Sequence, residues 1–152
     1  MIYRGQKIQL TAVKVLIAIN VLVFIFGSFF GGANSESVDD FLGLSGRGLS
    51  KGMVWQLVTY QFVHAGILHL LVNMAGLWFT GPVLERLMGC RRFVTFYLVA
   101  GVAGGLMQML LSPGPNLVGA SGSVCGLVAA FSALFPRMPI TALIFFVIPV
   151  RM

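Results

Sequence analysis

Long hydrophobic runs, separated by polar stretches and by stretches rich in glycine or proline, dominate the pattern of this chain. A helix that spans a membrane needs about 20 mostly apolar residues, within a range of about 17–25. Three runs meet this length, at residues 10–30, 65–84 and 93–111. A fourth run, at residues 121–135, would reach only about 22 Å, which is less than a hydrocarbon core of about 30 Å. The pattern therefore predicts four membrane helices, of which the last is short.

The segments between these runs carry the polar residues. Residues 31–53 contain charged residues, glycines and serines, and we expect an interfacial loop that is partly helical. The turn cluster Ser-Pro-Gly-Pro-Asn at residues 112–116 ends the third helix. A glycine-containing loop before a short helix suggests that the loop dips into the membrane. The apolar run 140–150 is too short to span and is expected to be an interfacial or buried connector.

Composition supports a membrane location. Hydrophobic residues make up 58% of the 152 residues and charged residues 9%, against roughly 45–50% and about 25% in soluble domains. So little charge cannot cover a water-facing surface, so lipid must cover much of it. The net charge is +6, but the basic residues are scattered. Loops that face an anionic membrane surface explain this charge more simply than nucleic acid, which we do not expect as a partner.

Charge placement provides an independent test of the layout. If the N-terminus is cytoplasmic and the helices alternate, the only basic residues outside are Arg47 and Lys51. Eight basic residues then lie inside, namely Arg4, Lys7, Lys14, Arg86, Arg91, Arg92, Arg137 and Arg151. This is the positive-inside bias of membrane proteins. We expect an integral multi-pass protein, and a short N-terminus without a targeting peptide suits a bacterial inner (plasma) membrane.

Polar residues inside membrane helices are costly and indicate function. His69 and Asn73 are four residues apart in the second run, so they share one helix face. Both can donate hydrogen bonds through side-chain nitrogens. The structural alternative is that they hydrogen-bond a neighbouring helix. His64 lies about one turn earlier, and we expect it to support the site or lie at the interface rather than to act as a catalyst.

A serine opens the fourth helix, in the segment GASGS at residues 119–123. Ser121 could simply be a helix N-cap. In the functional alternative, free N–H groups and the helix dipole at this position hold the oxyanion that forms when the hydroxyl attacks a carbonyl. Gly119 and Gly122 would let a substrate backbone approach. The segment does not fit the soluble-hydrolase pattern G-x-S-x-G, because Ser123 replaces the last glycine.

Small residues at the spacing that allows close helix packing lie on the predicted second, third and fourth helices. Gly81, Glu85 and Gly89 form one row at the end of the second helix, where we expect Glu85 to brace an arginine or backbone donors. Similar small residues lie on the third and fourth helices: Ala100, Gly101, Gly104, Gly105, Gly122, Gly126 and Ala130.

Three segments resemble motifs of the rhomboid proteases and follow in the right order. QFVHAGILHLLVNM (61–74) resembles the second-helix signature of that family. GPVLERLMG (81–89) is similar to its G-x-x-x-E-x-x-x-G segment, and GASGSVCG (119–126) to its G-A-S-G-x-x-x-G nucleophile motif. The resemblance covers roughly residues 10–152. It implies a single membrane domain, an all-α polytopic helix bundle in which four helices of a six-helix core are present.

The resemblance also implies an activity and a site. The family hydrolyses peptide bonds in or near transmembrane segments of membrane proteins, which would be the partners of this chain together with the lipid bilayer. Ser121 would be the nucleophile, and His69, Asn73 and the Ser121 backbone N–H would form the oxyanion hole. The loop 112–120 would line the site, and segment 31–53 would lie beside the path by which substrate enters. No cofactor and no metal are implied, and no oligomeric state is predicted.

One feature departs from the family pattern. The family's general base is a histidine on the sixth helix, but this chain has only His64 and His69. A serine needs a base within hydrogen-bond reach to act as a nucleophile. The end of the chain resembles the connector into the fifth helix, so we expect the base beyond residue 152 and expect the chain as written to be inactive. Truncation explains this better than a natural pseudoprotease, because Ser121, His69 and Asn73 are all present.

Two other functions compete with the protease. One is a rhomboid-like pseudoprotease that binds transmembrane clients without cleaving them. The weaker one is a fragment of a transporter or channel, with His69 and Asn73 in its pore.

Overall fold

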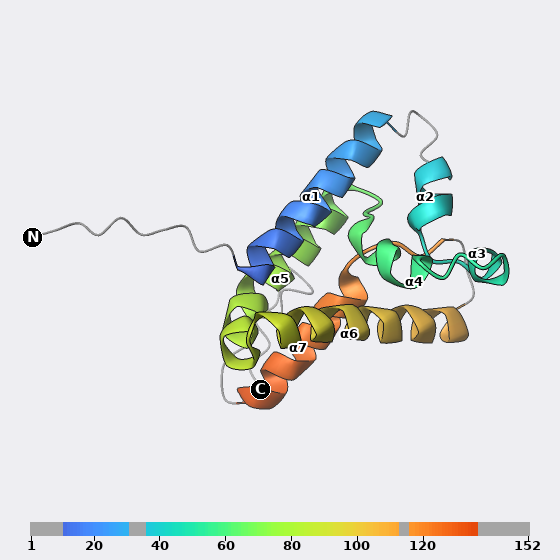
Figure 1. The fold of residues 1–152 in the computed structure, drawn as a ribbon. Coiled ribbons are helices and arrows are strands. Elements are labelled where there is room, and N and C mark those ends of the chain that lie inside the picture. The colour runs from blue at the N-terminus through green and yellow to red at the C-terminus, as the bar shows by residue number, and fades with distance from the viewer. Residues whose placement is uncertain (1–10, 31–35, 113–115, 137–152) are drawn as a thin grey trace, which may run out of the picture.

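A computed structural model describes residues 11–30, 36–112 and 116–136 of the protein. Its elements in chain order are α1 (Ala12–Phe30), α2 (Glu36–Leu42), α3 (Gly46–Ser50), α4 (Gln56–Thr59), the 3₁₀ helix η1 (Tyr60–Phe62), α5 (Ile67–Met88), α6 (Cys90–Leu111) and α7 (Ser121–Leu134). Within the described residues these elements are all helical, and the expected all-α fold is confirmed (Figure 1).

The ends of the long helices differ from those of the hydrophobic runs. α5 continues to Met88, past the predicted end at residue 84, and therefore includes the polar residues Glu85 and Arg86. Gly89 ends α5 with a φ of 80°, a conformation that favours glycine. α6 begins immediately afterwards, before the predicted start at residue 93. The connector expected at 140–150 lies outside the described residues.

α1 packs against α5 at a glycine and a glutamate. A Cβ built on Gly81 would lie 2.7 Å from Cγ2 of Val13, so the two helices could not approach this closely with a larger residue. The Glu85 carboxylate, one turn further along α5, accepts hydrogen bonds from the N–H groups of Ala12 at 2.8 Å and Val13 at 3.1 Å. These donors lie at the start of α1, where N–H groups lack helical partners and the helix dipole favours negative charge.

α7 packs between α5 and α6 through small residues. A Cβ on Gly104 of α6 would lie 2.9 Å from Cα of Gly122, so these two backbones almost touch. Gly126 meets the Cβ of Ala100 one turn further along α7. On the other side of α7, Val124 contacts Gly76 of α5. The small residues found in the sequence therefore lie where membrane helices approach most closely.

The segment between α1 and α5 includes the short helices α2, α3 and α4, which lie on one side of the bundle (Figure 1). The buried Gln56 carboxamide holds it together by donating to the Asp40 carbonyl at 2.8 Å and accepting from the Ser45 N–H at 3.2 Å. Leu44 and Leu117 exchange two backbone hydrogen bonds, of 2.9 and 2.8 Å. These bonds join the segment to the loop that precedes α7.

Three of the described helices are long and apolar enough to cross a membrane, at Ala12–Phe29, Ile67–Met88 and Cys90–Leu111. α7 is apolar but shorter, with 14 residues. Large apolar side chains are exposed along these helices, including Leu22, Phe26, Phe29, Leu68, Leu110 and Leu111. Exposed apolar surface of this kind suits contact with lipid rather than water. The core between the helices contains fully buried side chains such as Leu77, Leu84, Phe93, Tyr97 and Leu127.

Candidate active site

Ser121 is the first residue of α7, a few residues after Leu117, which pairs with Leu44. Its side chain is exposed, and no other described residue forms a hydrogen bond with its hydroxyl. The N-cap position belongs to Ala120, so Ser121 does not cap the helix as the structural alternative supposed. The hydroxyl therefore lies beside the first N–H groups of α7, which lack helical acceptors.

The imidazole of His69 packs against the turn before Ser121. A Cβ built on Gly119 would lie 2.6 Å from both Cε1 and Nε2 of that ring, so only glycine fits. Gly119 also has a φ of 120°, which side chains other than hydrogen rarely allow. Its N–H donates to the Tyr60 carbonyl at 2.9 Å, which fixes the turn to η1. The turn and the histidine can approach this closely because the residue between them has no side chain.

His64 contacts the same turn. Its ring meets the His69 ring edge-on, with centroids 5.1 Å apart, and its Nε2 accepts a long hydrogen bond of 3.5 Å from the Ala120 N–H. The side chain is 7% exposed, and its Nδ1 has no partner among the described residues. Burial, with a smaller effect of neighbouring His69, lowers the pKa of His64 to about 4. His64 is therefore neutral near pH 7, as its accepting role requires.

Asn73 lies on the helix face that meets α7. Its side-chain nitrogen donates to the His69 carbonyl at 2.9 Å, and the residue is buried. One turn further along α5, Gly76 contacts Val124, which is itself one turn beyond Ser121. Because side chains one turn apart share a face, Asn73 and Ser121 belong to the same interface between the two helices. No hydrogen bond joins either Asn73 or His69 to Ser121 in the part of the chain that the structure describes.

A buried polar cluster supports the start of α7 from the α6 side, and the sequence interpretation missed it. The Ser123 hydroxyl donates to Oε1 of Gln61 at 2.9 Å, and Nε2 of Gln61 donates to the Leu98 carbonyl at 3.3 Å. The Tyr60 hydroxyl donates to the Gly101 carbonyl at 2.6 Å. In the sequence, Ser123 stands out only because it departs from the pattern G-x-S-x-G. No pattern in the sequence identifies this role, because Gln61, the residue that Ser123 contacts, lies far away in the chain.

The expected supporting glycines serve internal contacts in the structure. Gly122 faces α6, where a Cβ would lie 3.4 Å from both the Gly101 oxygen and Cα of Gly104. Gly119 faces His69, as described above. The row at the end of α5 joins α1 through Gly81 and Glu85, and Gly89 forms the turn into α6. No group of three or more His, Cys, Asp or Glu side chains that could hold a metal occurs among the described residues.

The fold and this site define an integral membrane protein of packed helices, with an exposed serine at a helix start and two histidines that contact the turn before it. The family model of the Rhomboid domain matches residues 51–152. That match covers more than half of the chain, and the chain therefore belongs to the rhomboid family.

Named relatives agree with this membership. The chain is 35% identical over 121 residues to "Rhomboid protease GluP" of Bacillus subtilis (strain 168), covering 79% of this chain and 24% of that protein. It is 36% identical over 100 residues to "RHOMBOID-like protein 7" of Arabidopsis thaliana, covering 65% of this chain and 32% of that protein. It is 33% identical over 84 residues to "Rhomboid-like protease 3" of Toxoplasma gondii, covering 55% of this chain and 32% of that protein. The matches thus span only 24–32% of the length of these relatives.

Proposed function

We propose that this protein is an intramembrane serine endopeptidase that hydrolyses peptide bonds in or near transmembrane segments of other membrane proteins. The observation that supports this most directly is the contact of the His69 ring with Gly119, in the turn that leads into Ser121. A side-chain N–H donor, a hydroxyl and unpaired backbone N–H groups then lie around one helix start. That combination suits acyl transfer, in which a nucleophile attacks a carbonyl and donors stabilise the resulting oxyanion.

In this proposal Ser121 is the nucleophile, and its own N–H, His69 and Asn73 form the oxyanion hole. Asn73 would exchange its bond to the His69 carbonyl for one to the oxyanion. His64 would hold the turn through the Ala120 N–H. The proton of the Ser121 hydroxyl needs a base, and the two histidines of this chain already have other roles. We therefore assign the base to a histidine beyond residue 152.

The proposed setting is a bacterial inner membrane with the N-terminus in the cytoplasm. The basic residues of α5 and α6 lie near the turn at Gly89, whereas Ser121 lies at the opposite end of the bundle. Positive residues favour the cytoplasmic side, so the catalytic serine would lie toward the outer surface.

Cleavage of a test substrate with one transmembrane helix would examine this function directly. The protein would be produced from its complete coding sequence and reconstituted with that substrate in vesicles. We expect Ser121→Ala to abolish cleavage, because no other hydroxyl lies at the start of α7 with an exposed side chain. Ser132→Ala is the matched control, because its hydroxyl only donates to the Val128 carbonyl of the same helix. Cleavage should continue in that control.

Two outcomes would contradict the proposal. If the Ser121→Ala protein still cleaves, the nucleophile is another residue. If the unaltered protein binds the substrate helix but never cleaves it, the pseudoprotease alternative is favoured instead.

A further inference from the structure

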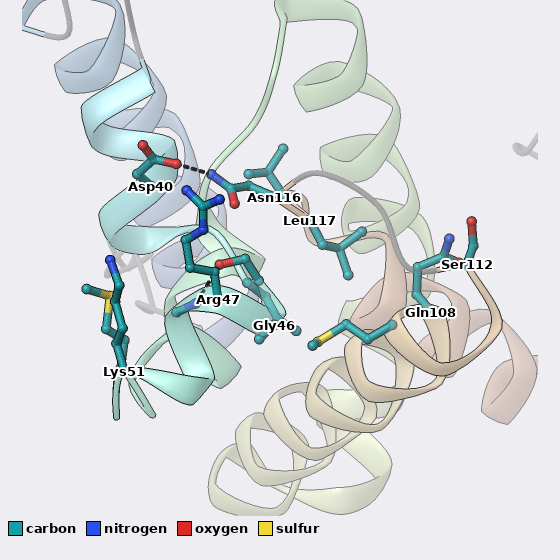
Figure 2. Close-up of a pocket in the computed structure, with 14 residues that line it drawn as sticks. Asp40, Gly46, Arg47, Lys51, Gln108, Ser112, Asn116 and Leu117 are labelled. Atoms are coloured by element: carbon teal, nitrogen blue, oxygen red, sulfur yellow. Dashed lines mark hydrogen bonds between the residues drawn. The ribbon is translucent and has the colours of Figure 1, made fainter.

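A large cavity lies between α3 and the C-terminal end of α6, on the loop that leads to α7. Its volume is about 1030 Å³, and neither Ser121 nor His69 lines it. Figure 2 shows Arg47 and Lys51 on the α3 side of this cavity, and Gln108 and Ser112 on the α6 side. The cavity therefore brings together two segments that are far apart in the sequence.

The charges around the cavity favour an anion. Arg47 and Lys51 both line it, and neither forms an ion pair with any residue that the structure describes. The carboxylate of Asp40 also lines it, but it already accepts a hydrogen bond of 2.6 Å from Nδ2 of Asn116 (Figure 2). Two cations against one carboxylate leave a positive balance. Gln108 and Ser112 add neutral groups that can donate hydrogen bonds.

The cavity lies beside the end of a helix that is long and apolar enough to cross a membrane, which is where lipid headgroups would be expected. Ser112 directly follows Leu111, the last residue of a helix long enough to span a membrane. Leu111 is 76% exposed, which suits contact with acyl chains. On the other side of the segment, the exposed Trp55 packs against Phe41 with ring centroids 5.3 Å apart, and its indole N–H donates to the Phe41 carbonyl. Tryptophan is enriched at membrane–water interfaces.

We propose that this cavity binds the phosphate group of an anionic membrane lipid. Arg47 and Lys51 contact the phosphate oxygens, and Gln108 and Ser112 donate hydrogen bonds to the phosphate or to the polar headgroup. Arginine is suited to phosphate because its guanidinium can donate two parallel hydrogen bonds. The acyl chains lie along the exposed end of α6. A soluble phosphate carries the same anion but has no apolar part to occupy that surface.

Lipid retention provides the test. The full chain is purified in a nonionic detergent, and the phosphatidylglycerol that stays bound is measured by mass spectrometry against added phosphatidylcholine. We expect the double variant Arg47→Gln/Lys51→Gln to bind phosphatidylglycerol about tenfold more weakly. The control Arg91→Gln/Arg92→Gln removes the same charge from exposed positions at the other end of α6. It should retain clearly more of this lipid than the double variant, because Arg91 and Arg92 do not line the cavity.

A second variant covers the case in which the double variant fails to fold. Asp40→Asn removes the carboxylate from the lining and keeps an acceptor for Asn116, so it should retain more phosphatidylglycerol. Equal retention in the folded double variant and the unaltered protein, or unchanged retention in Asp40→Asn, would overturn the proposal. If inorganic phosphate at the same concentration displaces the lipid, the site binds a soluble anion, and the lipid assignment fails.

Discussion

Gly119 restricts the turn before Ser121 to a conformation and a contact that only glycine allows. Its φ of 120° and its contact with His69 both exclude a side chain. The sequence predicted that His69 and Asn73 share a face, since that follows from their spacing alone. It could not predict that Gly119 would meet the His69 ring, because this contact depends on how two distant helices pack.

Gly119→Ala should destabilise the folded protein by about 1–3 kcal/mol, because the new methyl group meets the His69 ring and the backbone is strained. The midpoint of thermal unfolding in detergent measures this. Gly27→Ala is the control, because a Cβ there meets nothing within 4 Å and lies within α1. Its midpoint should stay the same or rise slightly. Equal losses in the two variants would show that the contact with His69 has no energetic effect.

His64 should make stability depend on pH. Its pKa is about 4 in the folded protein and about 6.5 in the unfolded chain. Between these values the unfolded chain binds the proton more strongly, so the free energy of unfolding is highest above about pH 6.5 and falls as pH is lowered towards 4. In His64→Gln, the free energy of unfolding should fall less as the pH is lowered. The midpoint of unfolding, followed from pH 7.5 to 4.5, measures this difference. An unchanged slope would contradict this assignment, and His69→Gln, measured in parallel, reports the contribution of the neighbouring ring.

At the scale of elements, α7 is positioned by polar contacts as well as by small residues. Ser123 and Gln61 are both fully buried and hydrogen-bond each other between α7, η1 and α6. The small-residue rows could be found from the sequence because their spacing repeats along a helix. The pairing of Ser123 with Gln61 could not, because the two residues are far apart in the chain and neither belongs to a repeating pattern.

Ser123→Ala should cost about 1–3 kcal/mol, because it leaves Oε1 of Gln61 buried without a donor. Unfolding with increasing concentrations of a denaturing detergent, followed by circular dichroism, would measure the loss in the free energy of unfolding. Ser132→Ala on the same helix removes only a bond to its own helix backbone, and its cost should be smaller. A double variant with Gln61→Leu tests the coupling. If the two losses simply add, the hydrogen bond does not stabilise the contact.

The ends of the elements were harder to predict than their existence. Hydropathy placed the end of the second helix at residue 84, because Glu85 and Arg86 are charged. The structure extends α5 to Met88, since the carboxylate finds donors on α1 and the arginine Nε donates to the Pro82 carbonyl. Charged residues interrupt a hydrophobic pattern, but they do not end a helix when tertiary contacts satisfy them.

At the scale of the whole molecule, α7 starts beside α4, away from the turn between α5 and α6 (Figure 1). Composition and the lengths of the hydrophobic runs sufficed to predict a helical membrane protein. They could not predict the cavity beside α3, because it forms only when segment 40–53 folds against the end of α6.

Labelling of single cysteines would determine the orientation in the membrane. Cys90 is exposed at the start of α6, beside several arginines. With Cys125 replaced by serine, a membrane-impermeant maleimide should label Cys90 only after the cells are permeabilised, because positive residues favour the cytoplasm. Ser50→Cys in a protein without the native cysteines should be labelled in intact cells. The reverse pattern would place Ser121 on the cytoplasmic side.

The bond between Glu85 and the first turn of α1 also constrains the order of assembly. The carboxylate lies 73 residues after Ala12, so α1 leaves the ribosome long before its acceptor has been synthesised. The backbone N–H groups at the start of α1 must remain hydrated until α5 has been inserted beside α1. During biogenesis of this domain, α1 is therefore inserted before it has all its final hydrogen bonds, and these form only when α5 is inserted beside it.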